Sequence, residues 1–344
     1  MNLTKFLFAV ILLGGIFLGT SCDDDDTTPS VDLATLQATI NSASGLISST
    51  TEGTAEGQFQ LGSQQTLQDA IDLAQGVLSN STSTQTQIDN ANIALTAAIA
   101  TFNASEIVPV DPDNLSGHWT FDGGSGTAAT DFSGNGFDGT FGTVAGFGGE
   151  MPTWTADRYG NANKAIAFDK GAKVTIPYNT ALNPSKMSIS LWVNAAENRE
   201  NNRFMGLHSW NGFKFQLQSG DKPFFTAATS EGIFDRDTDP ALDLNTWYHL
   251  TVTIGDGNMS FYVNGTKVKT WEDTPGTMVS VVGHDLVFGV GSSKYADTPD
   301  NYDNDQIIPL AWGGYFHGAL DEVRIYKSVL SDSQVSSIYA AEKP

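Results

Sequence analysis

The chain has 344 residues, and 39 Asp and Glu against 17 Lys and Arg give it a formal net charge of −22. This acidity argues against nucleic-acid binding, because proteins hold the phosphate backbone with Lys and Arg. A single Cys excludes an intrachain disulfide and any Cys-rich zinc or iron–sulfur site. The length predicts about two domains.

The N-terminal residues have the pattern of an export signal. Lys5 precedes an unbroken apolar run over residues 6–19, and small residues lead from there into Cys22. The run is too short for a helix that crosses about 30 Å of hydrocarbon. We therefore predict a secretory signal peptide over residues 1–21, with an uncleaved membrane anchor as the alternative.

Cys22 lies where such a signal would be cleaved. The arrangement resembles the lipobox of bacterial lipoproteins, although Gly19 stands three residues before the Cys, where that motif usually has Leu. The resemblance implies that Cys22 is lipidated, and several acyl chains make a stable membrane anchor.

Four Asp residues follow Cys22 directly, within an acidic tether over residues 22–30. A Cys with such a run resembles the surface-export signal of Bacteroidetes lipoproteins, which implies a lipid-anchored protein of the outer membrane that faces the cell exterior. In enterobacteria an Asp after the Cys would instead imply retention in the inner membrane. A solvated spacer is the simplest interpretation of the acidic run.

Residues 31–108 contain no Lys or Arg and carry three apolar stripes with helical spacing. Thr84 and Gln87 fit a capping box for the third helix, and Ser63 fits an N-cap for the second. Three short helices of this kind can bury their stripes only against one another, so we predict a three-helix bundle. The sequence around residues 84–99 resembles the FIVAR-type bundles of bacterial surface proteins, which implies a spacer.

After a linker over residues 109–114, which contains two prolines, the hydrophobic period changes from 3.6 to 2. Alternation over residues 187–193, 213–218 and 248–254 predicts strands, and Asn264-Gly265 predicts a hairpin turn. Many short strands without intervening helices are typical of an antiparallel sandwich or barrel. We therefore predict a mainly β domain over residues 115–344, with a helix only at its end, where Ser331 and Gln334 fit another capping box.

A series of motifs in this domain resembles, in the same order, the laminin-G-like, concanavalin A-like jelly rolls. The resemblance implies an antiparallel sandwich with one concave sheet, in a family whose members bind glycans, bind proteins or cut polysaccharides. It also implies a structural Ca²⁺, for which Asp131, Asp321 and Asp122 are the candidate ligands. The motifs occupy residues 118–122, 131–139, 165–169, 188–193, 246–253, 261–265 and 318–326.

The sequence offers little for catalysis. The Glu-x-Asp-x-x-Glu string of concanavalin-like hydrolases is absent, and so is the Gln-(Ile/Val)-His string of similar lyases. A retaining glycosidase needs two carboxylates on one substrate. Asp321 and Glu322 are adjacent, so a regular strand would point them to opposite faces. We predict a protein that is not an enzyme, with a divergent hydrolase or lyase as the alternative.

Exposed aromatic and planar polar side chains are the expected contacts for a glycan. Trp119, Trp192 and Trp247 fall within the shared motifs, so we interpret them as core or scaffold. Residues 201–211 combine planar donors with an aromatic and are the first choice for a site. Packed loop anchors are the alternative for the aromatics. The predicted glycan-binding residues are Arg203, His208, Trp210, Asn211, Trp154, Trp271, Trp312 and Tyr315.

Two Asp-rich loops, residues 235–243 and 297–305, offer oxygen ligands to Ca²⁺, but neither has the EF-hand spacing, and solvated surface is the simpler interpretation. These features together predict a surface lipoprotein that captures polysaccharide for uptake, with a TonB-dependent transporter complex as a further partner. The acidity favours a neutral glycan. A protein-binding adhesin is the alternative from another class.

Overall fold

The computed structural model describes residues 31–53, 55–144, 149–198, 201–290 and 314–344. The predicted signal peptide, Cys22, the Asp-rich loop 297–305 and Trp312 lie outside these residues, and so does the side chain of Trp210. In the part of the chain that is described, no helix is both long enough and apolar enough to cross a bilayer.

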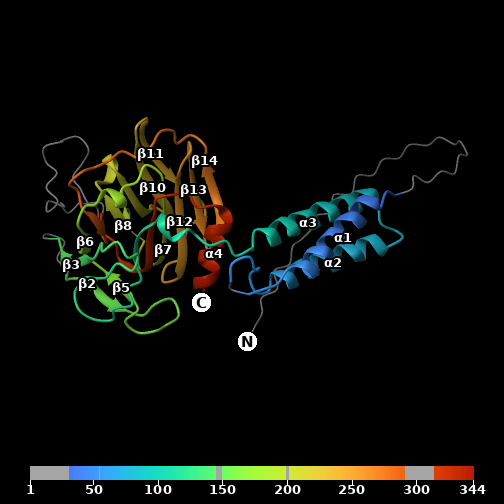
Figure 1. Cartoon of the computed structure of the whole chain (residues 1–344), viewed down its shortest axis with the longest axis horizontal. Helices are drawn as coiled ribbons and strands as arrows, with labels where there is room; N and C mark the ends of the chain where they lie inside the picture. The colour runs from blue at the N-terminus through green and yellow to red at the C-terminus, as the bar shows by residue number, and fades with distance from the viewer. Residues whose placement is uncertain (1–30, 54, 145–148, 199–200, 291–313) are drawn as a thin grey trace, which may run out of the picture.

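Three helices form an N-terminal bundle, as predicted (Figure 1). They are α1 (Ala34–Ser49), α2 (Ser63–Ser79) and α3 (Gln85–Asn103). The predicted stripes meet in a core that is separate from that of the β domain. Its buried side chains are Leu36, Ile40, Ala43, Phe59, Leu67, Ile71, Ala74, Ile88, Leu95 and Phe102.

The helix starts follow the predictions only in part. α3 begins with the predicted capping box, in which Thr84 and Gln87 each accept the other's backbone N–H. At α2, Gly62 is the N-cap and the prediction for Ser63 is wrong. Glu52 supplies the cap from a distant loop, because its carboxylate accepts the backbone N–H of Gln64 at 2.6 Å.

The strands that follow the bundle form two antiparallel sheets packed face to face, which confirms the predicted sandwich. The first sheet contains β1 (Leu115–Trp119), β4 (Thr153–Thr155), β5 (Ala165–Phe168), β7 (Met187–Ala195), β12 (Trp247–Gly255), β13 (Asn258–Val263), β14 (Thr266–Trp271) and β16 (Gly318–Tyr326). The second contains β2 (Ala128–Ala129), β3 (Gly139–Thr143), β6 (Ala172–Ile176), β8 (Asn202–Leu207), β9 (Phe213–Gln218), β10 (Lys222–Thr229), β11 (Gly232–Asp237) and β15 (Leu286–Phe288).

The strand order is β14-β13-β12-β7-β16-β5-β4 in the first sheet, where β1 also pairs with β16. It is β11-β10-β9-β8-β15-β6-β3-β2 in the second. Alternate side chains of both sheets fill the space between them, as the period of 2 predicts. The other side chains lie on the two outer faces, where a ligand site has to be sought.

The C-terminal helix α4 (Asp332–Glu342) covers part of the outer face of the first sheet (Figure 1). It begins with the predicted capping box of Ser331 and Gln334. Tyr339 stacks on Trp192 with 5.8 Å between the ring centroids, and Trp192 is only 2% exposed although it points away from the core. The rest of this outer face is left to the loops and to solvent.

Hydrogen bonds join α4 to the end of the helical bundle. Gln60 Nε2 donates to Ser336 Oγ at 2.8 Å, and the backbone N–H of Val108 donates to Ser337 Oγ at 2.9 Å. Ser337 is 7% exposed. The bundle is therefore tied to the sandwich at the helix that ends the chain.

Candidate functional site

One cross-strand row of the first sheet forms the floor of a groove. The register pairs Thr153 with Ala167, and Ala167 with Ala319. It continues from Ala319 to Asn194, and from Asn194 to Trp247. Residues paired directly across antiparallel strands point to the same face, so these five side chains share the outer face. The two central alanines leave open the space above the sheet.

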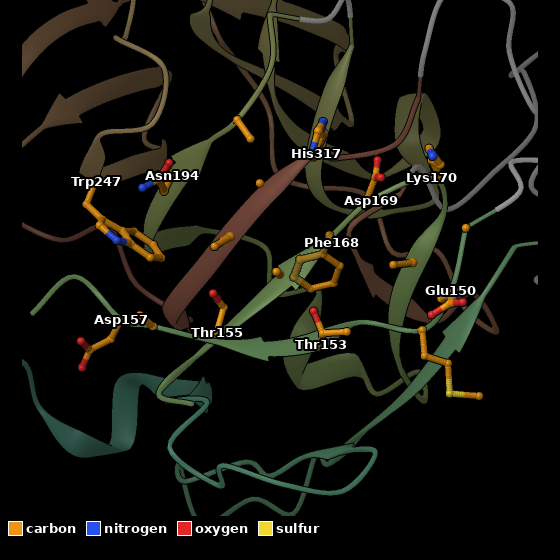
Figure 2. Close-up of a pocket in the computed structure, with 18 residues that line it drawn as sticks. Glu150, Thr153, Thr155, Asp157, Phe168, Asp169, Lys170, Asn194, Trp247 and His317 are labelled. Carbon is orange, nitrogen blue, oxygen red and sulfur yellow. The ribbon is translucent and has the colours of Figure 1, made fainter. Parts of the chain in front are cut away.

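The groove has a volume of about 740 Å³, which falls within the range of ligand sites in proteins. Figure 2 shows Trp247 and Asn194 toward one end, and Lys170 and Glu150 toward the other. The polar side chains that line it are Glu150, Thr153, Thr155, Asp157, Asp169, Lys170, Asn194 and His317.

Most of these polar groups have no hydrogen bond or ion pair to the protein within the described residues. Two are exceptions. Asp157 holds its own loop by accepting the backbone N–H groups of Tyr159 and Asn161. His317 Nδ1 lies 2.9 Å from Glu197 Oε2. The side chains that remain available to a ligand are Glu150, Thr153, Thr155, Asp169, Lys170 and Asn194.

Trp247 differs from the other tryptophans whose side chains are described. The indole N–H groups of Trp119, Trp154, Trp192 and Trp271 each donate to a protein oxygen at 2.8–3.0 Å. Trp247 is half-buried, and its indole N–H has no such acceptor among the described residues. It therefore keeps a hydrogen-bond donor, next to an aromatic surface, for a ligand in the groove.

Arg203, in the segment that was the first choice from the sequence, lies on the outer face of the second sheet instead. Its Nε donates to Gln216 Oε1 at 3.3 Å, and Gln216 Nε2 donates to Asn201 at 3.0 Å and to Gln218 at 2.7 Å. Arg203 and Gln216 are 2% and 0% exposed. This polar cluster is buried, whereas the groove is open.

Lys214 belongs to the same buried cluster. It pairs across the strands with Thr226, and Thr226 hydrogen-bonds Asp235. Burial, followed by the positive charge of Arg203, lowers the pKa of Lys214 to about 7. The charged form of this lysine is therefore disfavoured in its buried position.

His208 and Asn211, the other predicted residues of this segment whose side chains are described, do not line the groove. The His208 ring lies 3.8 Å from the His284 ring, and burial together with the charge of His284 lowers the pKa of His208 to about 4. Asn211 lies in a 3₁₀ turn, Ser209–Asn211. Residues 201–211 thus divide between the sheet and a turn, and their glycan contacts stay a prediction.

Trp154 and Trp271 close opposite edges of the sandwich. Trp154, on β4 of the first sheet, packs on Phe141 of the second sheet with 5.6 Å between the ring centroids. Trp271, on β14 of the first sheet, donates to the carbonyl oxygen of Asp237 on β11 of the second. Tyr315 packs in a small separate cluster of valines. Each of these aromatics packs against the protein. This agrees with the alternative interpretation of the sequence, in which they are packed anchors and not glycan contacts.

The three candidate Ca²⁺ ligands are held by different protein donors. Asp131 accepts the backbone N–H groups of His118, Ser133 and Phe137, and so organises its own loop. Asp122 is exposed and lies 3.4 Å from Lys164 Nζ. Within the described ranges, no group of three or more His, Cys, Asp or Glu is arranged to hold a metal ion.

Asp131, Asp122 and Asp321 therefore do not fit one Ca²⁺ site, because Ca²⁺ takes six to eight oxygen ligands in one place. Ca²⁺ binding by the protein stays a prediction. Unfolding curves recorded in Ca²⁺ and in EDTA would test it.

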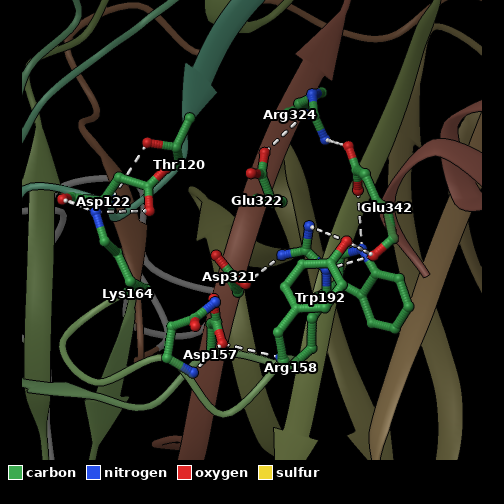
Figure 3. Close-up of polar contacts among 12 residues, drawn as sticks. Thr120, Asp122, Asp157, Arg158, Lys164, Trp192, Asp321, Glu322, Arg324 and Glu342 are labelled. Carbon is green, nitrogen blue, oxygen red and sulfur yellow. Dashed lines mark hydrogen bonds and ion pairs between the residues drawn. The ribbon is translucent and has the colours of Figure 1, made fainter. Parts of the chain in front are cut away.

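Asp321 and Glu322 lie on the same side of the first sheet, so the prediction that they point to opposite faces is wrong. A bulge in β16, with Glu322 at φ +50°, shifts the register between Asp321 and Arg324. Asp321 pairs with Arg158, and Glu322 Oε2 lies 2.7 Å from Arg324 Nη2 (Figure 3). The same Glu322 oxygen lies 2.7 Å from His118 Nε2. A bulge places two residues against one, which breaks the alternation.

This ion-pair network lies beneath α4 and outside the groove. Arg324 also binds Glu342 at the end of α4, and Glu342 accepts the indole N–H of Trp192 (Figure 3). Asp321 pairs across the strands with Trp192, in the row next to the groove floor. The two carboxylates are held by arginines and are not free to act on a substrate together.

The sequence alone missed the groove because its floor comes from five strands. Trp247 was assigned to the scaffold, and the alanines carry no chemical signal. Asn194 continues the outward positions of Ser188 and Ser190 in an alternating strand, so it gives no local sign of a site. Only the register brings Asn194, Ala319 and Trp247 together.

The architecture and the family comparison agree for the C-terminal region. Two antiparallel sheets form the sandwich, and residues 168–336 match the model of the family described as the concanavalin A-like lectin/glucanases superfamily. The C-terminal region is therefore a concanavalin A-like domain, and three helices precede it. No curated protein matches the chain.

Solved structures similar to the chain include domain 4 of AbnA, a GH43 extracellular arabinanase from Geobacillus stearothermophilus, in complex with arabinotriose. The identity is 20% and the TM-score 0.49, over 66% of this chain and 98% of the other. The binding domain of Paraclostridial Mosquitocidal Protein 1 is 17% identical, with a TM-score of 0.47 over 66% and 52% of the two chains. The botulinum neurotoxin serotype D binding domain is 16% identical, with a TM-score of 0.45 over 67% and 52%.

Proposed function

We propose that the concanavalin A-like domain binds polysaccharide in the groove of the first sheet and does not cleave it. One observation carries the proposal: an open groove holds Trp247, with an available indole N–H, together with polar side chains that have no partner among the described residues. Sites that bind sugars and other small ligands combine an apolar surface with a few polar groups of this kind. The family model, which covers lectins and glucanases, is consistent with such a ligand.

A binding role is favoured over hydrolysis because of where the carboxylates lie. Retaining glycosidases place two carboxyl groups about 5–5.5 Å apart on one substrate. Asp321 and Glu322 are the adjacent pair, but arginines hold both beneath α4. In the groove, Asp157 is engaged by its own loop, and Glu150 and Asp169 are the available carboxylates, which the assays for product release test directly.

We propose further that the protein is a lipoprotein of the outer cell surface, anchored through Cys22, which captures polysaccharide for uptake. The support is the sequence of the first 30 residues and the helical bundle, which would act as a spacer between membrane and ligand. A neighbouring TonB-dependent transporter would take up the captured glycan.

Binding is tested by affinity electrophoresis and titration calorimetry of the full chain against a panel of neutral and anionic polysaccharides. We expect binding to at least one neutral polysaccharide, with no release of reducing ends or unsaturated products. An Ala319→Phe variant fills the floor of the groove and should abolish binding. A panel with no binding would overturn the proposal, and binding of a protein partner alone would favour the adhesin.

Anchoring is tested separately. Mass spectrometry of the membrane fraction should find acyl chains on Cys22, and a Cys22→Ser variant should appear in the soluble fraction. Protease added to intact cells should digest the wild-type protein. If the protein resists protease until the cells are broken, it does not face the exterior.

A further inference from the structure

The two ends of the groove differ in chemistry. Trp247 and Asn194 form one end, where an aromatic ring lies beside an amide (Figure 2). Glu150, Asp169 and Lys170 lie toward the other end. Glu150 and Lys170 are exposed and Asp169 is half-buried, and none of the three forms an ion pair with a described residue.

Carboxylates outnumber cations along the groove. Glu150, Asp157 and Asp169 line it, against Lys170 and a His317 that already has Glu197 beside it. The chain as a whole carries a formal net charge of −22, so the surrounding field adds to the local one. A carboxylate or sulfate on a ligand would meet negative potential in the groove.

The floor is long enough for both ends to act on one ligand. Its row of residues crosses five strands, from Thr153 on β4 to Trp247 on β12. Four strand spacings of about 4.8 Å each give a floor of about 19 Å. Several sugar rings in one chain would reach from the aromatic end to the charged end.

We propose that this groove selects an uncharged glycan through two separate sets of residues. A sugar ring stacks on Trp247 while its hydroxyls bind the Asn194 amide, and Glu150 and Asp169 repel glycans that carry carboxylate or sulfate groups. The inference rests on the proposed function and names the ligand class and the residues that set it. Trp247 and Asn194 supply affinity, whereas Glu150 and Asp169 supply discrimination.

The aromatic end is tested by Trp247→Ala and its control Trp271→Ala. Both tryptophans are half-buried on the first sheet, but Trp271 lies outside the groove. Loss of a central aromatic contact typically lowers affinity about ten-fold or more. We expect that loss for a neutral polysaccharide with Trp247→Ala, partial recovery with Trp247→Phe, and a change within about two-fold for Trp271→Ala. Melting temperatures show that each variant is folded.

The charged end is tested with pairs of polymers that share a backbone. Dextran is compared with dextran sulfate, and hydroxyethylcellulose with carboxymethylcellulose, at low ionic strength. The wild-type chain should bind the neutral member of a pair more tightly. Raising the salt to about 0.5 M should narrow the difference, because the screening length shortens from about 10 Å at 0.1 M toward 3 Å at 1 M.

The double variant Glu150→Gln/Asp169→Asn should bind the anionic member about five-fold or more tightly than the wild type does, with unchanged affinity for the neutral member. The control Asp69→Asn/Asp72→Asn removes the same charge from exposed positions on α2 and should leave both affinities unchanged.

The outcomes separate the two proposals. If Ala319→Phe abolishes binding but Trp247→Ala does not weaken it, the groove is the binding site but the role given to Trp247 is wrong. If the wild type binds both members of a pair equally at low salt, or if the double variant leaves their ratio unchanged, the charge selection is wrong. If the wild type binds no polysaccharide, the proposed function fails and this inference fails with it.

Discussion

The imidazole of His249 lies in the row next to the groove floor, fully buried beneath α4. Its Nε2 lies 2.7 Å from Ser190 Oγ, and the Tyr339 ring of α4 is 5.9 Å away. Burial, followed by the positive charges of Arg324 and Arg158, lowers the pKa of His249 to about 3. The folded domain therefore holds a neutral histidine over the whole physiological range.

The stability of the domain should depend on pH through His249. An unfolded histidine takes up a proton near pH 6.5, and the folded one does so only near pH 3. Its contribution is complete above pH 6.5 and is lost as the pH falls from 6.5 toward 3. At pH 5 the loss is about 2 kcal/mol, or roughly 4–8 °C in Tm. Glutamine does not titrate. In a His249→Gln variant, the fall in Tm between pH 8 and pH 5 should therefore be smaller than in the wild type by this amount.

Thermal unfolding of the variant and the wild type across this pH range makes the comparison. Gln65→Ala, an exposed change on α2 at a residue that does not titrate, serves as the control and should show the same fall in Tm as the wild type. Identical pH dependence for His249→Gln and the wild type would contradict the assignment of the buried histidine.

Single residues were the hardest feature to predict. The sequence indicates which side chains alternate, so the burial of Trp119 and Trp192 followed from the motifs. It does not indicate which tryptophan has an indole N–H without an acceptor in the described part of the chain, because the acceptors come from distant segments. The bulge at Glu322 was also beyond prediction, since no local residue marks the positive φ that puts two carboxylates on one side.

At the scale of elements, α4 is held to the sheet by charge as well as by packing. Arg324 of β16 lies 2.5 Å from Glu342 at the end of α4, and Arg158 donates to the Glu342 carbonyl oxygen at 2.6 Å. Both Arg324 and Glu342 have side chains that are little exposed. An ion pair removed from water in this way depends on both partners being present.

Replacing Glu342 by Ala should leave Arg324 with one carboxylate instead of two. Because Arg324 keeps Glu322, the loss in the free energy of unfolding should be at or just below the lower limit of the range for a broken buried pair, at about 2–3 kcal/mol. Lys343→Ala, an exposed change one residue away, should alter it by less than about 0.5 kcal/mol. Denaturant unfolding measures both, and equal stability for the two variants would show that α4 is held by packing alone.

Elements were largely predictable from the sequence. Both capping boxes formed as expected, because each depends on residues only three positions apart. Strand alternation identified β7, β9 and β12 for the same local reason. The cap of α2 failed because Glu52, which lies in another segment, competes for the same backbone N–H groups.

At the scale of the whole molecule, the bundle and the sandwich meet at a polar contact. Gln60 and Val108 reach Ser336 and Ser337 of α4 through hydrogen bonds. Small polar contacts of this kind orient two domains without contributing much to the stability of either. The junction therefore sets the direction in which the groove faces relative to the bundle.

A Gln60→Ala/Ser337→Ala variant should loosen this orientation. Small-angle scattering of the variant should show a larger mean radius and a broader distance distribution than the wild type, while the Tm of the sandwich changes by less than about 4 °C. The control Gln68→Ala/Ser79→Ala changes the same residue types on α2, outside the junction, and should leave the scattering unchanged. Superimposable curves for all three proteins would mean that the domains are oriented by other contacts.

The pairing of β1 with β16 determines how the domain would carry a mechanical load. A pull from the bundle enters at Leu115, which pairs with Tyr326 at the far end of β16. A pull from a polymer in the groove enters at Ala319, toward the other end of β16. The two forces would then slide β1 along β16, so that the hydrogen bonds between Leu115–Trp119 and β16 resist together rather than opening one at a time. A domain built in this way would bear the load from a bound polymer as shear between β1 and β16.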